Sequence, residues 1–361
     1  MNHLYIGTYT SAESKTGRRS EGIYRFRFDP TTGALTPAGV TTGIANPSWL
    51  TLHPNGRFLY AGSEVREHGQ RSGGAAVAYA RDAATGELTR INDELTGGAG
   101  PCYLSLEPTG RLLMVANYAS GNLTVIPVRE DGGLEPASQI IQLAGSGPIA
   151  DRQEGPHAHC VVPDPTGRYA LAADLGSDRV MVYRMDPAAR RLIPADPPSI
   201  ALVPGTGPRH IAFHPNGRWV YVTGELNSTL TVFSWDAGHE RLEHVQIVGT
   251  LPEGWRGINY PAEVAVAPSG RFVYMSNRGH DSIAIFAADP ATGRLTPAGH
   301  APTQGAFPRH FALDPTGAFM LVANQNSDNV VVFRVGGVTG LLTPTGHSAT
   351  VPMPVCVRFA A

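Results

Sequence analysis

Arginine, histidine and glutamate side chains recur at corresponding places in this sequence, and together they could carry acid–base chemistry on an anionic substrate. The stretch GPRHIAFHPNGRWVYVTGELNS places Arg209 and His210 before a hydrophobic run and Glu225 after it. His157 in GPHAH and Arg278 in SNRG stand in comparable stretches. A guanidinium offers two parallel donors to a carboxylate or phosphate, while carboxylates and imidazoles move protons. These residue types therefore indicate ionic and acid–base chemistry.

Two short turn motifs repeat along the chain and predict the elements that carry these residues. The first motif begins at 53, 107, 164, 214, 267 and 314, as in HPNGR, EPTGR and DPTGR. The second recurs in seven copies, such as DPTTGALTP from 29 and DPATGRLTP from 289. Each copy lies between two hydrophobic runs, which is typical of hairpins, so one repeat carries four strands. Four strands in about 50 residues predict a β-propeller blade.

The two ends of the chain complete one another. MPVCVRFAA at the end resembles the strand before the first turn motif, and LYIGTYT at the start resembles the strand after it. A blade built from both termini would close the ring and leave no exposed sheet edge. The sequence therefore predicts an all-β fold, a single seven-bladed β-propeller domain over residues 1–361, with four-stranded antiparallel blades.

Comparison of the blades with one another separates scaffold from candidate site. We align the third blade on Pro156 and Pro163, which makes its turn two residues longer than in the other blades. The first set compared is the residue after the proline that opens each first strand: Ser48, Cys102, His157, Arg209, Ala262, Arg309 and Val355. The eighth residues after the turn glycine are Glu64, Tyr118, Leu175, Glu225, Arg278 and Gln325, with Tyr9 by analogy in the split blade. Both positions fall at one end of a hairpin. In a propeller they would face one mouth of the central channel, where ligands often bind.

Several ionisable residues close to these positions are further candidates: His159, His210, His310, Glu263 and Arg256. The direction of the His159 side chain depends on the register chosen for the third blade. A repeat consensus that pairs neighbouring blades would explain the recurring Arg-His as well as a site would, so the residues alone leave both interpretations open.

Composition excludes several classes of partner. The net charge is −2 without a basic run, so we expect neither nucleic acid nor a membrane surface as a partner. No apolar stretch approaches the roughly 20 residues of a membrane span and the start lacks a signal-peptide pattern, so we expect a cytoplasmic protein. Cys102, Cys160 and Cys356 are interpreted as buried free thiols. Zinc, P-loop and dinucleotide motifs are missing, so we expect no metal and no cofactor. We also expect a monomer or weak homo-oligomer.

The sequence resembles the lactonase family of seven-bladed propellers, which contains bacterial propeller-type 6-phosphogluconolactonases and fungal carboxymuconate-lactonizing enzymes. The resemblance runs from YIGTYT to the closing strand, and GPRH followed by ELNS is its most specific part. It implies an active site of one histidine, two arginines and one glutamate, which match His157, Arg209, Glu225 and Arg278.

The resemblance implies a metal-independent hydrolase that converts 6-phospho-D-glucono-1,5-lactone to 6-phospho-D-gluconate, a step of the pentose phosphate pathway. Glu225 would act as general base and His157 as proton donor, or the two would exchange roles. Arg209 and Arg278 would hold phosphate or a developing oxyanion. Further contacts to the small anionic lactone are expected from Arg309, His159, His210 and Glu64. Two alternatives stay open, a muconolactone cycloisomerase and a non-enzymatic binding platform.

Overall fold

The structure is a computed structural model that describes residues 2–360, and its regular elements over that range are β-strands. Seven sheets have four strands each, and an eighth is a two-stranded hairpin. Neighbouring strands pair antiparallel. The all-β prediction with four-stranded antiparallel blades is therefore confirmed. By compactness the described residues form two units, unit 1 with residues 2–43, 212–234 and 243–360, and unit 2 with residues 44–211 and 235–242.

Unit 1 contains three complete sheets, with strand orders β3-β2-β1-β30, β22-β23-β24-β25 and β26-β27-β28-β29. Their bounds are β1 (Asn2–Thr8), β2 (Ile23–Phe28), β3 (Leu35–Thr41), β30 (Pro354–Ala360), β22 (Tyr260–Val266), β23 (Phe272–Arg278), β24 (Ser282–Ala288), β25 (Leu295–Pro302), β26 (Pro308–Leu313), β27 (Phe319–Asn324), β28 (Asn329–Val335) and β29 (Leu342–Thr350). Edge-to-face rings such as Phe28 on Phe319, with centroids 5.6 Å apart, fill the core between sheets.

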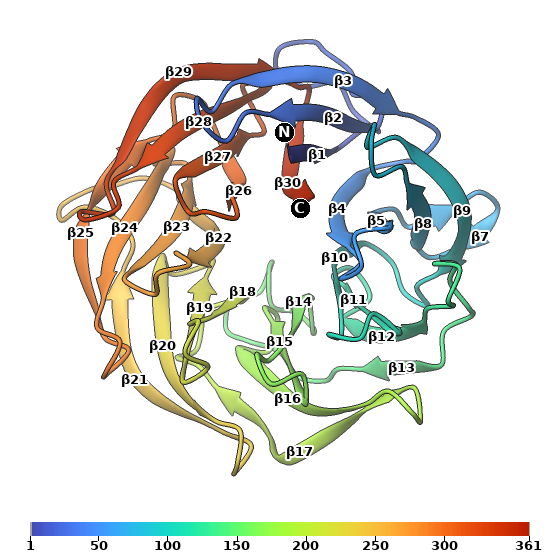
Figure 1. Cartoon of the computed structure of the whole chain (residues 1–361). Helices are drawn as coiled ribbons and strands as arrows, with labels where there is room; N and C mark the ends of the chain where they lie inside the picture. The colour runs from blue at the N-terminus through green and yellow to red at the C-terminus, as the bar shows by residue number, and fades with distance from the viewer. Residues whose placement is uncertain (1, 361) are drawn as a thin grey trace. The chain divides into compact units, whose positions relative to one another are not determined.

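The blade shared between the chain ends is present in unit 1. β1 pairs antiparallel with β2 on one side and with β30 on the other, and Tyr5 lies opposite Arg358. Figure 1 shows β1 and β30 side by side, with the labels of both chain ends next to them. The prediction of a blade built from both termini is confirmed.

Unit 2 contains three further four-stranded sheets, with orders β4-β5-β8-β9, β10-β11-β12-β13 and β14-β15-β16-β17, and a small hairpin inserted after β5. Their bounds are β4 (Pro47–Leu52), β5 (Phe58–Ser63), β6 (Glu67–His68), β7 (Arg71–Ser72), β8 (Ala75–Arg81), β9 (Leu88–Leu95), β10 (Pro101–Leu106), β11 (Leu112–Asn117), β12 (Asn122–Pro127), β13 (Gln139–Gln142), β14 (Ala158–Pro163), β15 (Tyr169–Asp174), β16 (Arg179–Asp186) and β17 (Arg191–Ala201). The seventh four-stranded sheet has the order β18 (Pro208–Phe213), β19 (Trp219–Gly224), β20 (Thr229–Asp236) and β21 (Arg241–Gly249).

The first turn motif closes each hairpin by local polar contacts. In DPTGR the Asp164 carboxylate accepts hydrogen bonds from the Thr166 hydroxyl and from the amides of Arg168 and Tyr169. Gly167 has φ of 69°, a left-handed conformation that glycine adopts at low cost. The turn has ordinary length, because the Gly167 amide bonds to Asp164 as Gly110 does to Glu107.

The register predicted for the third blade is wrong. Its first strand begins at Ala158, which pairs with Asp174 as Pro101 pairs with Asn117 in the preceding sheet. The long segment before β14 leaves Pro156 outside the strand, so the turn needs no extra residues. His159, and not His157, therefore occupies the position after the opening residue.

That position is a β-bulge. The pairing register shifts between Pro47 and Trp49, Pro101 and Tyr103, Ala158 and Cys160, and Pro308 and His310. The skipped residues are Ser48, Cys102, His159 and Arg309. Bulges leave a residue unpaired and turn its side chain away from the regular alternation. The position compared between blades in the sequence is therefore one where the bulge can direct a side chain out of the regular strand pattern.

None of the described residues belongs to a helix with the length and apolar character needed to cross a bilayer. Cys102, Cys160 and Cys356 are buried and are not joined in disulfides, which confirms their interpretation from sequence.

Candidate functional site

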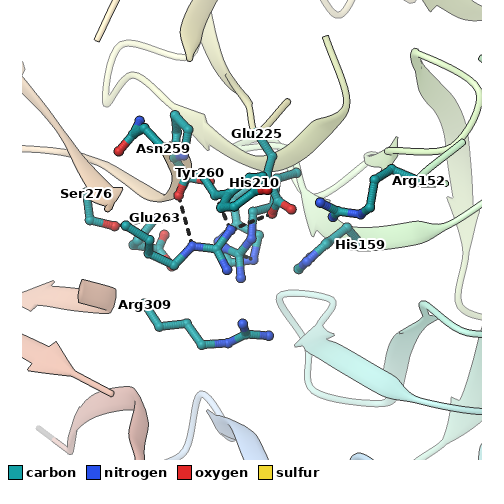
Figure 2. Close-up of polar contacts among 12 residues, drawn as sticks. Arg152, His159, His210, Glu225, Asn259, Tyr260, Glu263, Ser276 and Arg309 are labelled. Carbon is teal, nitrogen blue, oxygen red and sulfur yellow. Dashed lines mark hydrogen bonds and ion pairs between the residues drawn. The ribbon is translucent and has the colours of Figure 1, made fainter. Parts of the chain in front are cut away.

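Glu225 and Arg278 form a buried ion pair in unit 1. Glu225 follows β19 and Arg278 ends β23, and the two residues are 4% and 5% exposed. The Arg278 Nη2 lies 2.7 Å from the Glu225 Oε2, and the Arg278 Nε donates to the Tyr260 carbonyl at 2.9 Å (Figure 2). A charge-assisted bond of this kind keeps the carboxylate ionised. We call Glu225, Tyr260, Arg278 and Phe307 the ion-pair cluster.

The backbone around Phe307 supports the guanidinium from one side. The carbon centre of the Arg278 guanidinium lies 5.2 Å from the centroid of the Phe307 ring, within cation–π range. Phe307 has φ of 64°, an uncommon conformation for an aromatic residue, and its amide donates to Asp281 Oδ1 at 2.7 Å. Asp281 thus holds the strained residue that carries the ring under the guanidinium.

Glu263 and His310, two further sequence candidates, contact one another in the same unit. The His310 Nδ1 accepts the Val357 amide at 3.3 Å, so the ring proton belongs on Nε2, 3.2 Å from the Glu263 carboxylate. The contact between the His310 Nε2 and the Glu263 carboxylate is electrostatic, because its geometry does not meet that of a hydrogen bond. The Glu263 amide donates to the Ser276 hydroxyl, and both residues are labelled in Figure 2.

Arg309 contacts Tyr9, the residue that the sequence comparison placed in the split blade by analogy. The Arg309 Nη2 donates to the Tyr9 hydroxyl at 2.9 Å, and the guanidinium lies 5.3 Å from the ring centroid. The Tyr9 amide bonds to the Met353 carbonyl. Gln325 makes the same backbone bond to Phe307, so the analogy for Tyr9 is confirmed.

Unit 2 carries a chain of aromatic rings at its own candidate residues. We call this set the ring cluster: Trp49, Tyr103, His210, His159, Tyr118 and His157. Trp49 stacks on Tyr103, and both meet the edge of His210; His210 meets His159, His159 meets Tyr118, and Tyr118 stacks on His157. Every link has a centroid distance between 4.0 and 5.3 Å. Such contacts fix ring orientations without placing net charge.

His157 is held by four contacts. Its ring stacks on Tyr118 with centroids 4.5 Å apart, its Nδ1 lies 3.0 Å from the Tyr118 carbonyl, and its Nε2 lies 3.2 Å from the Glu154 Oε1. Its amide donates to Asp174 Oδ1 at 2.7 Å. Carbonyl and carboxylate oxygens only accept, so both ring nitrogens carry a proton when both contacts are hydrogen bonds. Both ring nitrogens of His157 therefore face hydrogen-bond acceptors.

Asp174 is the buried support of this histidine. Burial raises the pKa of the Asp174 carboxyl above its ordinary value, and hydrogen bonds from Ser177 and from the amides of His157 and Gly176 oppose that shift. Asn117, Asn277 and Asn324 stand at the equivalent pairing position in other blades. The carboxylate is therefore a departure from the repeat.

Arg209 and His210 lie against one another in unit 2. The Arg209 Nη1 is 3.2 Å from the Nδ1 and 3.1 Å from the Nε2 of the His210 ring. A nitrogen in the ring plane at these distances would overlap Cε1, so the guanidinium lies over the ring face. Each residue is 2% exposed. The imidazole thus supports the flat side of the guanidinium.

The remaining predicted residues are placed as follows. His159 is 5% exposed, and its Nδ1 lies 3.7 Å from the Cys102 sulfur. Glu64 is partly buried, and its amide bonds to the Asn46 carbonyl. Arg256 is exposed in the segment before β22. Within residues 2–360 no group of three or more His, Cys, Asp or Glu side chains is arranged to hold a metal ion.

Sequence reasoning missed the residues that stand one position before the opening residue of each blade, including Tyr260 and Phe307. This position has positive φ at Asn46, Gly100, Gly207, Phe307 and Met353. His157 and Tyr260 lack it, and both follow the longest segments before a first strand, 143–157 and 250–259. The unusual length of the segments 143–157 and 250–259 was the signal in the sequence that could have pointed to these residues.

Comparison with known proteins gives a consistent result. The family model described as "Lactonase, 7-bladed beta-propeller" matches residues 3–359. A 6-phosphogluconolactonase from Bacillus subtilis is 35% identical over 98% of this chain and 97% of its own length. The structure of a periplasmic gluconolactonase from Pseudomonas aeruginosa has a TM-score of 0.92 and 38% identity, covering 100% of this chain and 99% of that one. A putative 6-phosphogluconolactonase from Bacteroides fragilis has a TM-score of 0.91 and 35% identity, covering 100% and 98%. With its seven four-stranded sheets and this full-length match, the chain belongs to the lactonase family of seven-bladed β-propellers.

Proposed function

We propose that this chain is a lactonase that hydrolyses 6-phospho-D-glucono-1,5-lactone to 6-phospho-D-gluconate. One observation carries the proposal. In a member of the lactonase family, Glu225 is kept ionised by Arg278, and His157 has both ring nitrogens directed at acceptors. A lactonase needs a base for water and an acid for the leaving oxygen, and in this proposal Glu225 serves as the base and His157 as the acid.

The reaction follows from those states. Water attacks the lactone carbonyl carbon and gives a proton to the Glu225 carboxylate. The bond between that carbon and the ring oxygen breaks, and the ring oxygen takes the proton from the His157 Nε2. The Nδ1 keeps its proton and donates it in a hydrogen bond to the Tyr118 carbonyl, so Nε2 is the transferable position. A lactone is an activated ester, so positioning and these two proton transfers suffice.

The arginines divide the remaining work in this proposal. The hydrogen bonds described for Arg278 go to Glu225 and to the carbonyls of Tyr260 and Pro261, so its main role is to hold the base. Arg209 and Arg309 would bind the phosphate or the developing oxyanion, since a guanidinium suits both groups. His210 would support Arg209.

The unphosphorylated lactone is the second candidate substrate, because the Pseudomonas aeruginosa relative is named a gluconolactonase. That relative is also periplasmic, whereas a phosphorylated sugar lactone would place the present chain in the cytoplasm, which is the compartment we propose.

The test is the decay of each lactone, freshly prepared and followed by NMR with and without the purified protein. We expect decay well above the spontaneous rate, with the higher kcat/KM for the phosphorylated lactone. A higher value for glucono-1,5-lactone would transfer the proposal to the unphosphorylated sugar. Acceleration of neither would overturn the proposal, and turnover of a muconolactone would then identify a cycloisomerase.

A further inference from the structure

Glu154 is the only charged side chain described in hydrogen-bond contact with the His157 ring, and the general acid–base scheme assigns it no task. The Glu154 Oε1 lies 3.2 Å from the His157 Nε2, the nitrogen whose proton is transferable. The opposite nitrogen faces the Tyr118 carbonyl. The Glu154 side chain is 61% exposed, so this contact is solvated on one side.

The segment that carries Glu154 is anchored by its neighbour Gln153, which is fully buried. The Gln153 side-chain Nε2 donates to the Leu175 carbonyl at 2.8 Å, and its Oε1 accepts the Ile149 backbone amide at 3.2 Å. The Gly147 amide donates to the Gln153 carbonyl. These contacts set the position of Glu154 although its carboxylate is exposed.

The residues between Glu154 and β14 are confined by two glycines. A Cβ on Gly176 would lie 1.8 Å from the Gly155 carbonyl oxygen, and a Cβ on Gly121 would lie 2.2 Å from the Pro156 carbonyl oxygen. Neither position has room for a side chain. The backbone from Gly155 to His157 is therefore held between two turns, and the ring and the carboxylate keep a defined spacing.

We infer that Glu154 is a positioning residue that keeps the transferable proton on the Nε2 of His157. In the resting protein the carboxylate accepts the Nε2–H bond and stabilises the imidazolium. When the ring oxygen of the substrate leaves, it takes that proton, and His157 becomes neutral with its other proton still on Nδ1, donated to the Tyr118 carbonyl. Solvent then returns a proton to Nε2 and takes up the proton that Glu225 received from water. This inference rests on the proposed function for its catalytic part, but the proton on Nε2 is a property of the protein alone.

The contacts described for the other charged or titratable groups of unit 2 near this ring do not go to its nitrogens. Asp174 binds the His157 amide and not the ring, Arg152 reaches the Tyr118 hydroxyl at 3.5 Å, and His159 meets the Tyr118 ring edge. The backbone amide of Glu154 and then the hydrogen bond with His157 lower the pKa of the Glu154 carboxyl. The carboxylate is therefore charged at neutral pH and able to hold a proton on its partner.

The test compares wild type with Glu154→Gln, and uses Glu135→Gln as the matched control. Glu135 is a surface carboxylate of the same unit that pairs with Arg190, so the control makes the same charge change away from His157. NMR of the ring nitrogens gives the pH at which His157 loses its second proton, and kcat/KM against pH gives the alkaline limb of activity. An exposed pair of this kind is expected to move both by about half a pH unit, to lower pH, in Glu154→Gln only.

An unchanged His157 titration in Glu154→Gln would overturn the inference, as would a shifted titration with an unshifted alkaline limb. If the wild type turned over no lactone, the proposed function would fail, and the NMR titration would still show whether Glu154 holds the proton.

Discussion

In the ion-pair cluster a charge is held by an opposite charge, whereas in the ring cluster it is held by neutral oxygens, stacked rings and one solvated carboxylate. Glu225 and Arg278 are both nearly inaccessible, and each needs the other to remain ionised in the interior. His157 sits between a tyrosine ring and an exposed glutamate, so its charge can change at modest cost. The difference suits the two roles in the resting protein, since a base must be ionised before it takes a proton from water and an acid must carry the proton that it gives up.

The largest effect is expected from removing the base. Glu225→Gln should lower kcat by about 10²–10⁴-fold, because proton transfer from water is lost while shape is kept. The measurement is steady-state turnover of the phosphorylated lactone, with circular dichroism to show that the fold is retained. Turnover close to wild type would show that Glu225 is not the base.

The next largest effect is on stability, and it concerns the buried ion pair that distinguishes the ion-pair cluster from the ring cluster. Arg278→Met should lower the free energy of unfolding by about 3–5 kcal/mol, because it leaves a buried carboxylate without its partner. The double variant Glu225→Gln, Arg278→Met should recover much of that loss. Urea unfolding of wild type, the two single variants and the double variant measures the coupling. An additive double variant would mean that the ion pair does not hold the cluster together.

A smaller loss is expected from loosening His157. Tyr118→Ala removes the stacked ring and should reduce kcat/KM by about 10- to 100-fold through misplacement of the imidazole. Tyr118→Phe keeps the stack and the backbone carbonyl, and should retain activity near that of wild type. Equal activity of all three proteins would remove Tyr118 from the account.

The smallest effect is a pH dependence of stability at Asp174. Burial raises the pKa of this carboxyl above its ordinary value of 3.8, so the folded state binds the proton more tightly than the unfolded state. Its contribution to stability is complete below that value and is lost as the pH rises through the folded pKa. Asp174→Asn, the residue found at this position in other blades, should lack that loss. Urea unfolding at pH 4 and pH 7 tests this, and an unchanged difference between the two pH values would contradict it.

Much of the fold could be predicted from sequence because turn chemistry repeats. The split blade follows from the first and last strands, and the candidate column corresponds to a row of bulges. The register of the third blade was predicted wrongly because Pro156 follows a glycine, as Pro101 and Pro208 do, and so was taken for the proline that opens the first strand. In other blades the opening residue stands nine positions before the turn glycine, as Pro101 does before Gly110. Counting back nine positions from Gly167 gives Ala158, so this spacing would have placed the strand correctly.

The supports of the candidate residues could not be predicted in this way. Phe307 contacts Arg278, and Tyr118 contacts His157, through side chains that belong to neighbouring blades. Such contacts depend on how sheets pack and not on a repeat within one sheet. Glu154 lies in a segment with no counterpart of equal length, so comparison of the blades gave no position for it.

The division of labour between Glu225 and His157 is tested most directly by the pH dependence of kcat/KM for wild type and His157→Gln. The account predicts a bell-shaped profile for wild type, and a profile for the variant that is lower throughout and keeps the acidic limb while the alkaline limb disappears. A variant that keeps the alkaline limb and loses the acidic one would exchange the two roles and contradict the account.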